Sequence, residues 1–199
     1  MTRVIGLTGS IASGKSTVSL MFDEFNIPVI DADKISREVV MPGEKAYEQI
    51  VDTFGEEVLR EDKSLDRKKL GAIVFKNEEK RQQLNNIVHP AVREKMLERR
   101  DAYTTSGEKS VVLDIPLLFE SKLKGFVEKT IVVYVDEDVQ LARLMERDGY
   151  SEEEAHQRIN AQMPVKKKAE LADAIIDNNG TRRDTYQQLE SLLREWEVI

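Results

Sequence analysis

A glycine-rich stretch near the N-terminus constrains this 199-residue chain more than any other feature. Residues 9–16, GSIASGKS, fit the pattern G-x-x-x-x-G-K-[ST] of phosphate-binding loops. An apolar run at residues 4–7 predicts a buried strand before the loop, and apolar residues at helical spacing follow from Ser13 onward. Free N–H groups and the helix dipole favour an anion at such a helix N-terminus. The sequence therefore predicts a nucleoside triphosphate site.

The residues of this loop have different expected roles. Gly9 and Gly14 would let the backbone curl around the phosphates at φ values that other residues resist. Lys15 would reach the β- and γ-phosphates, and the Ser16 hydroxyl would bind Mg²⁺. The residues expected to contact the nucleotide here are Gly9, Ala12, Ser13, Gly14, Lys15, Ser16 and Thr17.

Composition narrows the class of protein. The chain has no cysteine, which excludes disulfides and thiolate metal sites and fits a reducing, cytoplasmic location. The first strand starts too early to leave room for a signal peptide, and no apolar run approaches the roughly 20 residues of a membrane span. A net charge of −7 argues against a broad nucleic-acid-binding surface. We therefore expect neither nucleic acid nor membrane as a partner.

Five short apolar runs indicate the strands of one α/β domain. They lie at residues 4–7, 29–33, 111–114, 131–135 and 174–177. The runs are continuously apolar, as is typical of a parallel sheet with helices on both faces. Two helical excursions interrupt this order. The first follows the second strand and is broken at His89-Pro90, because proline disfavours helix in the residue before it. The second is a charged hairpin, residues 138–147 and 152–162, whose second helix begins with a Ser151–Glu154 capping box.

Several acidic side chains fall at the predicted carboxyl ends of strands, where α/β sheets bind ligands. Asp31 and Asp33 are two residues apart, so in an extended chain both project on one face. Either could accept the proton of an attacking hydroxyl, and Asp33 could instead cap a helix that begins at Lys34. Asp114 could hold Mg²⁺ or be an ordinary turn residue.

The charged hairpin has two interpretations. Arg143 and Arg147 share one helix face, and Arg158 lies on the partner helix. These arginines could close over the triphosphate as a mobile lid. Alternatively, the neighbouring glutamates and aspartates could make the hairpin a solvated set of surface ion pairs. The run Lys166–Lys167–Lys168 is expected to be solvated.

With these residues in view, the chain resembles the dephospho-CoA kinase family over nearly its whole length. The resemblance is carried by motifs along the chain: residues 6–9 and 14–17, Asp31-Ala32-Asp33 with Arg37, His89-Pro90, residues 116–120 (PLLFE), Arg143, Arg147-Asp148, Arg158, Gln162 and residues 177–180 (DNNG). The segment PLLFE is the most diagnostic after the phosphate loop. Ser10 and Ala12 stand where the family often has glycines, which we expect to stiffen the loop slightly without loss of activity.

The resemblance implies transfer of the ATP γ-phosphoryl group to the ribose 3′-hydroxyl of dephospho-CoA, with Mg²⁺. It assigns Asp33 as general base, Lys15 and Ser16 to phosphates and metal, and the hairpin as a lid. The nucleotide would also contact Arg143, Arg147 and Asn178, and Ser16 and Asp114 would hold the metal. The acceptor would contact Asp31, Asp33, Arg37, His89, Leu117 and Glu120.

The implied architecture is a P-loop nucleoside triphosphate hydrolase fold formed by one kinase domain, residues 1–199. Its core would be residues 1–35, 108–137 and 172–199, its acceptor-binding insert residues 36–107 and its lid residues 138–165. Another P-loop kinase of small metabolites or nucleotides would share this architecture. A guanine-nucleotide switch is disfavoured, because the chain contains no Asn-Lys-x-Asp tetrad.

Overall fold

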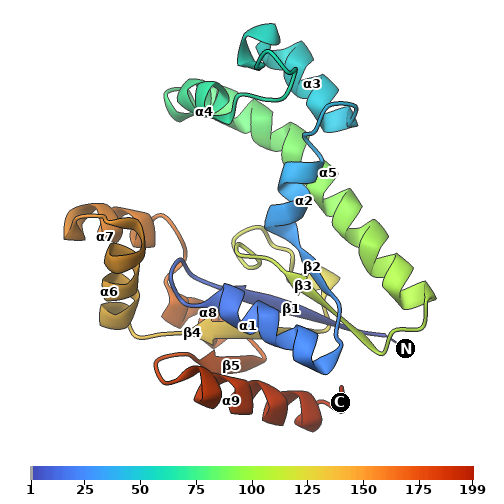
Figure 1. Cartoon of the computed structure of the whole chain (residues 1–199), viewed down its shortest axis with the longest axis vertical. Coiled ribbons are helices and arrows are strands. Elements are labelled where there is room, and N and C mark those ends of the chain that lie inside the picture. The colour runs from blue at the N-terminus through green and yellow to red at the C-terminus, as the bar shows by residue number, and fades with distance from the viewer. Residues whose placement is uncertain (1) are drawn as a thin grey trace. The chain divides into compact units, whose positions relative to one another are not determined.

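A computed structural model describes residues 2–199 of the chain. Its centre is a five-stranded parallel sheet with the strand order β2-β3-β1-β4-β5, which confirms the predicted fold class (Figure 1). The strands are β1 (Arg3–Gly9), β2 (Val29–Asp31), β3 (Ser110–Asp114), β4 (Lys129–Tyr134) and β5 (Ala174–Asp177).

The register of the central strands brings the predicted carboxyl ends to one edge of the sheet. Leu7 of β1 is aligned with Asp114, the last residue of β3, and Gly9 of β1 is aligned with Val133 of β4. β1 therefore extends two residues beyond its partner β3 and delivers Gly9 directly into the phosphate loop. This edge is where a doubly wound sheet binds its ligand.

Helices cover both faces of the sheet. On one face α1 and α9 bury a continuous apolar core with β1, β3, β4 and β5, and Phe22 and Leu189 in this core are fully buried. α8 packs on β4, and Gly6 of β1 lies against Leu118 and Val127. The helices outside residues 32–105 are α1 (Lys15–Met21), α6 (Glu137–Asp148), α7 (Glu152–Asn160), α8 (Val165–Leu171) and α9 (Arg182–Glu195), with short 3₁₀ turns η1 (Phe22–Phe25) and η3 (Lys124–Phe126).

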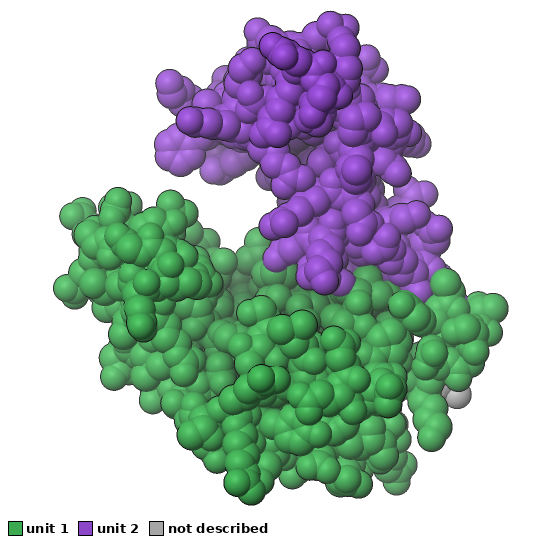
Figure 2. Space-filling view, viewed as in Figure 1, with its two compact units in different colours: residues 1–30, 102–199 green, residues 31–101 purple. Residues whose placement is uncertain are grey.

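The chain divides into two compact units, residues 1–30 with 102–199 and residues 31–101, which Figure 2 colours separately. The second unit is almost entirely helical. Its core is a separate apolar cluster that includes Ile50, Phe54, Val58, Leu65 and Leu70. Its elements are α2 (Ala32–Glu38), α3 (Lys45–Phe54), η2 (Glu56–Val58), α4 (Arg67–Phe75) and α5 (Glu78–Thr105).

The expected helix break at His89-Pro90 is wrong. α5 runs without interruption for 28 residues and contains Pro90 in its interior. A proline there removes one hydrogen bond and crowds the carbonyl four residues earlier, at a cost of about 3 kcal/mol. The same helix contributes Leu84, Ile87 and Val88 to the apolar cluster of the second unit and buries Met96. Burial of this apolar face offsets the local cost of the proline.

No helix within residues 2–199 is both long and apolar enough to cross a membrane.

Candidate active site

The phosphate loop connects β1 to α1 through a backbone that turns twice into the left-handed region. Gly14 has φ 88° at the N-terminus of α1, as expected. Ala12 also adopts a positive φ, 58°, which costs an alanine about 1–2 kcal/mol. The expectation that Gly9 needs an unusual φ is wrong, because Gly9 is not among the positive-φ residues. Gly9 is needed for space instead, since a Cβ there would lie 2.5 Å from the Ser13 hydroxyl oxygen.

Side chains from distant elements hold this loop in place. The Asn178 amide nitrogen donates to the Ser13 carbonyl oxygen (2.8 Å), and its amide oxygen accepts from the Thr185 hydroxyl (2.8 Å). Gln140 of α6 donates to the Ile11 carbonyl oxygen (2.7 Å). Asn178 and Gln140 are both buried. Asn178 therefore supports the loop from behind, and its expected contact with the nucleotide stays a prediction.

Two further hydrogen bonds connect the loop to the chain that follows α7. The Ile11 N–H donates to the Gln162 side-chain oxygen (2.9 Å), and the Ser10 hydroxyl donates to the Met163 carbonyl oxygen (3.2 Å). The loop therefore contacts both ends of the α6–α7 hairpin, because Gln140 lies near the start of α6 and Gln162 follows α7. Neither contact was predicted from the sequence, where Gln162 was named only for its resemblance to the lid of the family.

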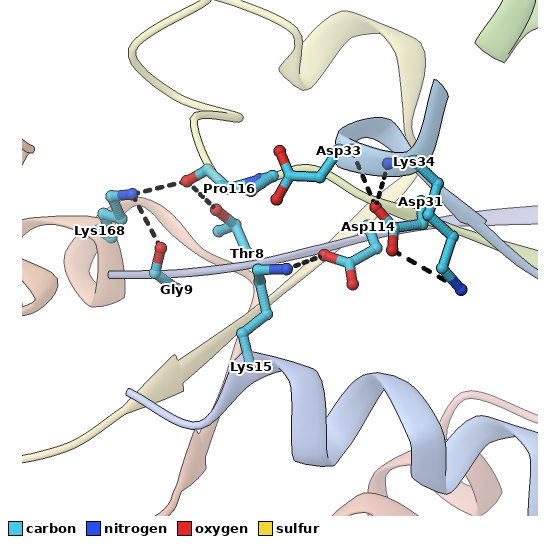
Figure 3. A network of polar contacts seen from close by, with 9 residues as sticks. All are labelled: Thr8, Gly9, Lys15, Asp31, Asp33, Lys34, Asp114, Pro116 and Lys168. Carbon is cyan, nitrogen blue, oxygen red and sulfur yellow. Dashed lines mark hydrogen bonds and ion pairs between the residues drawn. The ribbon is translucent and has the colours of Figure 1, made fainter. Parts of the chain in front are cut away.

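Lys15 and Asp114 meet at the start of α1. The Lys15 ammonium lies 2.5 Å from a carboxylate oxygen of Asp114, which is 2% exposed (Figure 3). The adjacent Ser16 side chain is exposed, and its hydroxyl has no partner within residues 2–199. A hydroxyl and a carboxylate are the hard oxygen donors that Mg²⁺ prefers, and such sites complete the metal's shell with phosphate and water. The residues therefore fit a magnesium ion bound together with a triphosphate.

Asp31 and Asp33 have separate roles in the structure. The expectation that both project from an extended segment is wrong, because α2 begins at Ala32 and Asp33 is already helical. The expectation that Asp33 could be the cap is also wrong. The cap is Asp31, whose carboxylate accepts from the N–H groups of Asp33 (2.8 Å) and Lys34 (3.0 Å) (Figure 3). The exposed Asp33 carboxylate has no partner within the described chain.

The arginines of the hairpin do not contact the phosphate loop. Arg147 forms an ion pair with its neighbour Asp148 (2.8 Å). The hydrogen bond between them raises the pKa of the Arg147 guanidinium and lowers the pKa of the Asp148 carboxyl. Arg158 lies over the ring of Tyr150, 4.5 Å from its centre. Arg143 is half-buried on α6 and has no partner within residues 2–199. The Ser151–Glu154 capping box is confirmed at the start of α7.

The remaining predicted residues lie on exposed or intermediate surface. Arg37 and His89 are exposed on α2 and α5. Leu117 is 41% exposed in the segment that follows β3. In the same segment, one oxygen of the Glu120 carboxylate accepts from the Met163 N–H (3.2 Å), and the other is buried without a partner.

The expectation of a solvated lysine run is wrong for one of its three members. Lys166 and Lys167 are exposed, but Lys168 is fully buried. Its ammonium donates to the carbonyl oxygens of Gly9 and Pro116 (Figure 3). Helical spacing could have revealed this residue, because Lys168 follows the buried Val165 by three positions and so faces the same side of α8.

Comparisons with a family model, with curated proteins and with solved structures all point to the same family. A family model described as dephospho-CoA kinase matches residues 3–184. A dephospho-CoA kinase from Oceanobacillus iheyensis is 61% identical over 198 residues, covering 100% of both chains. Among solved structures, a dephospho-CoA kinase from Campylobacter jejuni is 34% identical with a TM-score of 0.76 and covers 98% of each chain. A Thermus thermophilus protein is 32% identical with a TM-score of 0.81, covering 98% of this chain and 97% of that one.

Proposed function

The chain belongs to the dephospho-CoA kinase family, and we propose on that premise that Asp33 is its general base. As a member of this family the protein is a kinase that uses ATP to phosphorylate dephospho-CoA, a step of coenzyme A synthesis. In the proposed reaction the ribose 3′-hydroxyl oxygen of dephospho-CoA attacks the γ-phosphorus of ATP. The bond from that phosphorus to the β–γ bridging oxygen breaks, ADP leaves, and Asp33 takes the hydroxyl proton.

The observation that supports this proposal most directly is that the Asp31 carboxylate caps α2 while the Asp33 carboxylate has no partner in the described chain. The carboxylate of Asp31 is occupied by the N–H groups at the start of α2. That of Asp33 is exposed, and nothing in the described chain engages it. A general base must be able to reach the proton that it accepts, so an unengaged carboxylate suits the role better than a capping one.

The phosphate loop supplies alignment and positive charge. Its N–H groups and Lys15 would bind the β- and γ-phosphates, and Lys15 would exchange its ion pair with Asp114 for these phosphates. Ser16 and Asp114 would hold Mg²⁺, which neutralises phosphate charge when it is bound. Phosphoryl transfer requires little covalent chemistry from the protein, so this alignment is the main contribution of the loop.

The hairpin and the helical unit complete the proposed enzyme. Arg143, which has no partner in the described chain, would bind ATP when the lid closes, with Arg147 beside it. Residues 138–165 would form the lid and residues 36–107 the acceptor-binding insert. The acceptor would contact Asp31, Arg37, His89, Leu117 and Glu120. We further infer a cytoplasmic location, because the chain has no cysteine and its substrates are small soluble molecules.

The decisive experiment measures ADP release from Mg-ATP with dephospho-CoA as acceptor. Adenosine, AMP, shikimate, gluconate and an acceptor-free sample run beside it. We expect strong stimulation by dephospho-CoA alone. Stimulation by another of these acceptors would keep the kinase mechanism and overturn the proposed acceptor site. Omission of Mg²⁺ is expected to abolish turnover.

The same assay tests the general base. Asp33→Asn preserves the shape of the side chain and removes its basicity, so we expect turnover to fall about 10²–10⁴-fold. ADP affinity is expected to stay close to that of the wild type. Asp31→Asn is the matched comparison, because asparagine caps a helix about as well as aspartate and the substitution leaves the proposed base in place. Wild-type turnover in Asp33→Asn would contradict the assignment.

A further inference from the structure

Lys168 is the residue for which the proposed mechanism gives no role. It is a fully buried lysine in α8, whereas its two neighbours Lys166 and Lys167 are exposed. Burial lowers the pKa of its ammonium, and the nearby carboxylate of Glu120 partly opposes that shift. A lysine in a protein interior costs free energy unless its charge and its three N–H donors are satisfied. Its retention here therefore requires a specific arrangement of partners.

Three acceptors surround the ammonium, and they come from three parts of the chain. The Gly9 carbonyl oxygen lies at 3.1 Å and the Pro116 carbonyl oxygen at 2.8 Å (Figure 3). A carboxylate oxygen of Glu120 lies at 3.0 Å. Three donors thus meet three acceptors, so the ammonium is fully used. Gly9 begins the phosphate loop, while Pro116 and Glu120 bound the segment PLLFE, residues 116–120.

The contact with Gly9 determines the direction of a phosphate-loop N–H group. The peptide unit is planar and trans, so the Gly9 carbonyl and the Ser10 N–H point in opposite directions. The ammonium of Lys168 holds the carbonyl oxygen on the side of α8. The Ser10 N–H must therefore point away from α8. An apolar side chain at position 168 would remove this contact from the Gly9 carbonyl oxygen.

The contacts with Pro116 and Glu120 bring the second segment into the same arrangement. The Pro116 carbonyl oxygen also accepts from the buried Thr8 hydroxyl of β1 (2.9 Å). The same oxygen of Glu120 that meets Lys168 also accepts from the Met163 N–H. The segment PLLFE is thus fastened to β1, to α8 and to the chain that returns from the hairpin.

We propose that Lys168 is a positioning residue that sets the phosphate loop and the segment PLLFE in one fixed arrangement through a single ammonium group. It acts through Gly9 on the nucleotide and through Pro116 and Glu120 on the acceptor. The acceptor half of this inference rests on the proposed function, in which Leu117 and Glu120 contact dephospho-CoA. The nucleotide half depends only on the phosphate loop.

The test compares three variants. Lys168→Met retains the packing of the long side chain and removes all three contacts. Thr8→Val removes only the second donor to Pro116 and leaves the contact with Gly9. Lys167→Met is the matched control, because it makes the same exchange on the exposed side of α8. ADP affinity by calorimetry, KM for ATP and KM for dephospho-CoA are measured well below each melting temperature, on protein whose fold is checked by circular dichroism.

A charge-assisted hydrogen bond corresponds to roughly a tenfold or larger change in affinity. We therefore expect Lys168→Met to weaken ADP binding and to raise both KM values about tenfold. Thr8→Val is expected to raise only the KM for dephospho-CoA, about threefold, and Lys167→Met to match the wild type. If the methionine protein does not fold, Lys168→Gln replaces it, and its shorter amide is expected to give a smaller change in the same direction.

A purely structural lysine would give a different result. In that case folded Lys168→Met would melt earlier but bind ADP within twofold of the wild type with unchanged KM values, and the inference would be overturned. A wild-type protein that binds ADP but is not stimulated by dephospho-CoA would instead contradict the proposed function. The calorimetric comparison of ADP binding remains decisive in that case, because it requires no acceptor.

Discussion

The phosphate loop and the α6–α7 hairpin both contain residues that we propose bind the triphosphate, but they are built in opposite ways. Around the loop, Asn178, Gln140 and Lys168 reach the backbone from distant parts of the chain, and all three are buried. Among the charged side chains of the hairpin the contacts are local. Arg147 pairs with the next residue, and the capping box joins positions three apart.

This difference indicates how each region prepares for its ligand. The backbone of the loop is already held by these contacts, so little backbone ordering entropy would be lost when phosphate binds. The hairpin keeps an arginine without a partner in the described chain, so a closing movement would not have to break an ion pair of Arg143. Substitutions of Lys15 in the loop should therefore affect stability and activity together, and those of Arg143 in the hairpin activity alone.

Lys15→Ala is expected to have the largest effect. It removes a positive charge from the phosphates and leaves the buried Asp114 without its ion-pair partner. We expect kcat/KM to fall about 10²–10³-fold and stability to fall by about 1–3 kcal/mol. Steady-state kinetics and thermal melting measure the two losses. Unchanged kinetics would contradict the phosphate-binding role. An unchanged melting temperature would show that the Lys15–Asp114 ion pair does not stabilise the phosphate loop.

Arg143→Ala is the counterpart in the hairpin. We expect kcat to fall about 10–10²-fold, because the proposed mechanism loses a charge that would act on the transition state. The melting temperature should remain that of the wild type, since the guanidinium has no partner within residues 2–199. Arg143→Lys retains the positive charge and should recover part of the rate. A fall in melting temperature as large as that of Lys15→Ala would mean that the two regions are not built differently.

Acid should loosen the hairpin before the loop. Hydrogen bonds from Arg147 and from Ser151 lower the pKa of Asp148 and Glu154, respectively. A lowered carboxyl pKa contributes stability above its unfolded value, here 3.8 and 4.5, and this contribution is lost as the pH falls through the folded value. The amide contacts of Asn178 and Gln140 do not titrate. Hydrogen-exchange protection of α7 should therefore decrease below about pH 4 while that of α1 persists, and Glu154→Gln should reduce this pH dependence.

Ala12→Gly is expected to have the smallest effect. Glycine adopts the left-handed φ of this position without strain, but it also has more freedom in the unfolded chain. These terms oppose each other, so stability should change by less than about 1 kcal/mol. Melting and KM for ATP provide the measurement. A loss of several kcal/mol would show that the alanine methyl group makes a contact that the loop needs.

Most of the sheet could be predicted because its strands are defined by local apolar runs. The strand ends at Asp114 and Asp177 follow from runs that stop at an acidic residue, whereas the second strand was expected to reach Asp33 and ends at Asp31. Gly14 and Lys15 could be assigned because the phosphate-loop pattern specifies chemistry position by position. The capping box at Ser151 was predictable for the same reason, since both partners lie within four residues.

The residues that sequence reasoning missed depend on tertiary packing. Pro90 reads locally as a helix breaker, and only the apolar face that α5 buries overrides that preference. Lys168 reads as one of three solvated lysines until α8 is placed on the sheet. The capping role of Asp31 depended on where α2 begins, a boundary that differs by two residues between an expected start at Lys34 and the observed start at Ala32.

Gly14 and Asn178 share one volume of space. A Cβ on residue 14 would lie 2.0 Å from the amide nitrogen of Asn178. The Asn178 side chain therefore occupies the space that a side chain at position 14 would need. A larger residue at position 14 would collide with the asparagine, and loss of the asparagine would leave the Ser13 carbonyl without its donor. Substitutions at these two positions are therefore expected to have non-additive effects on stability.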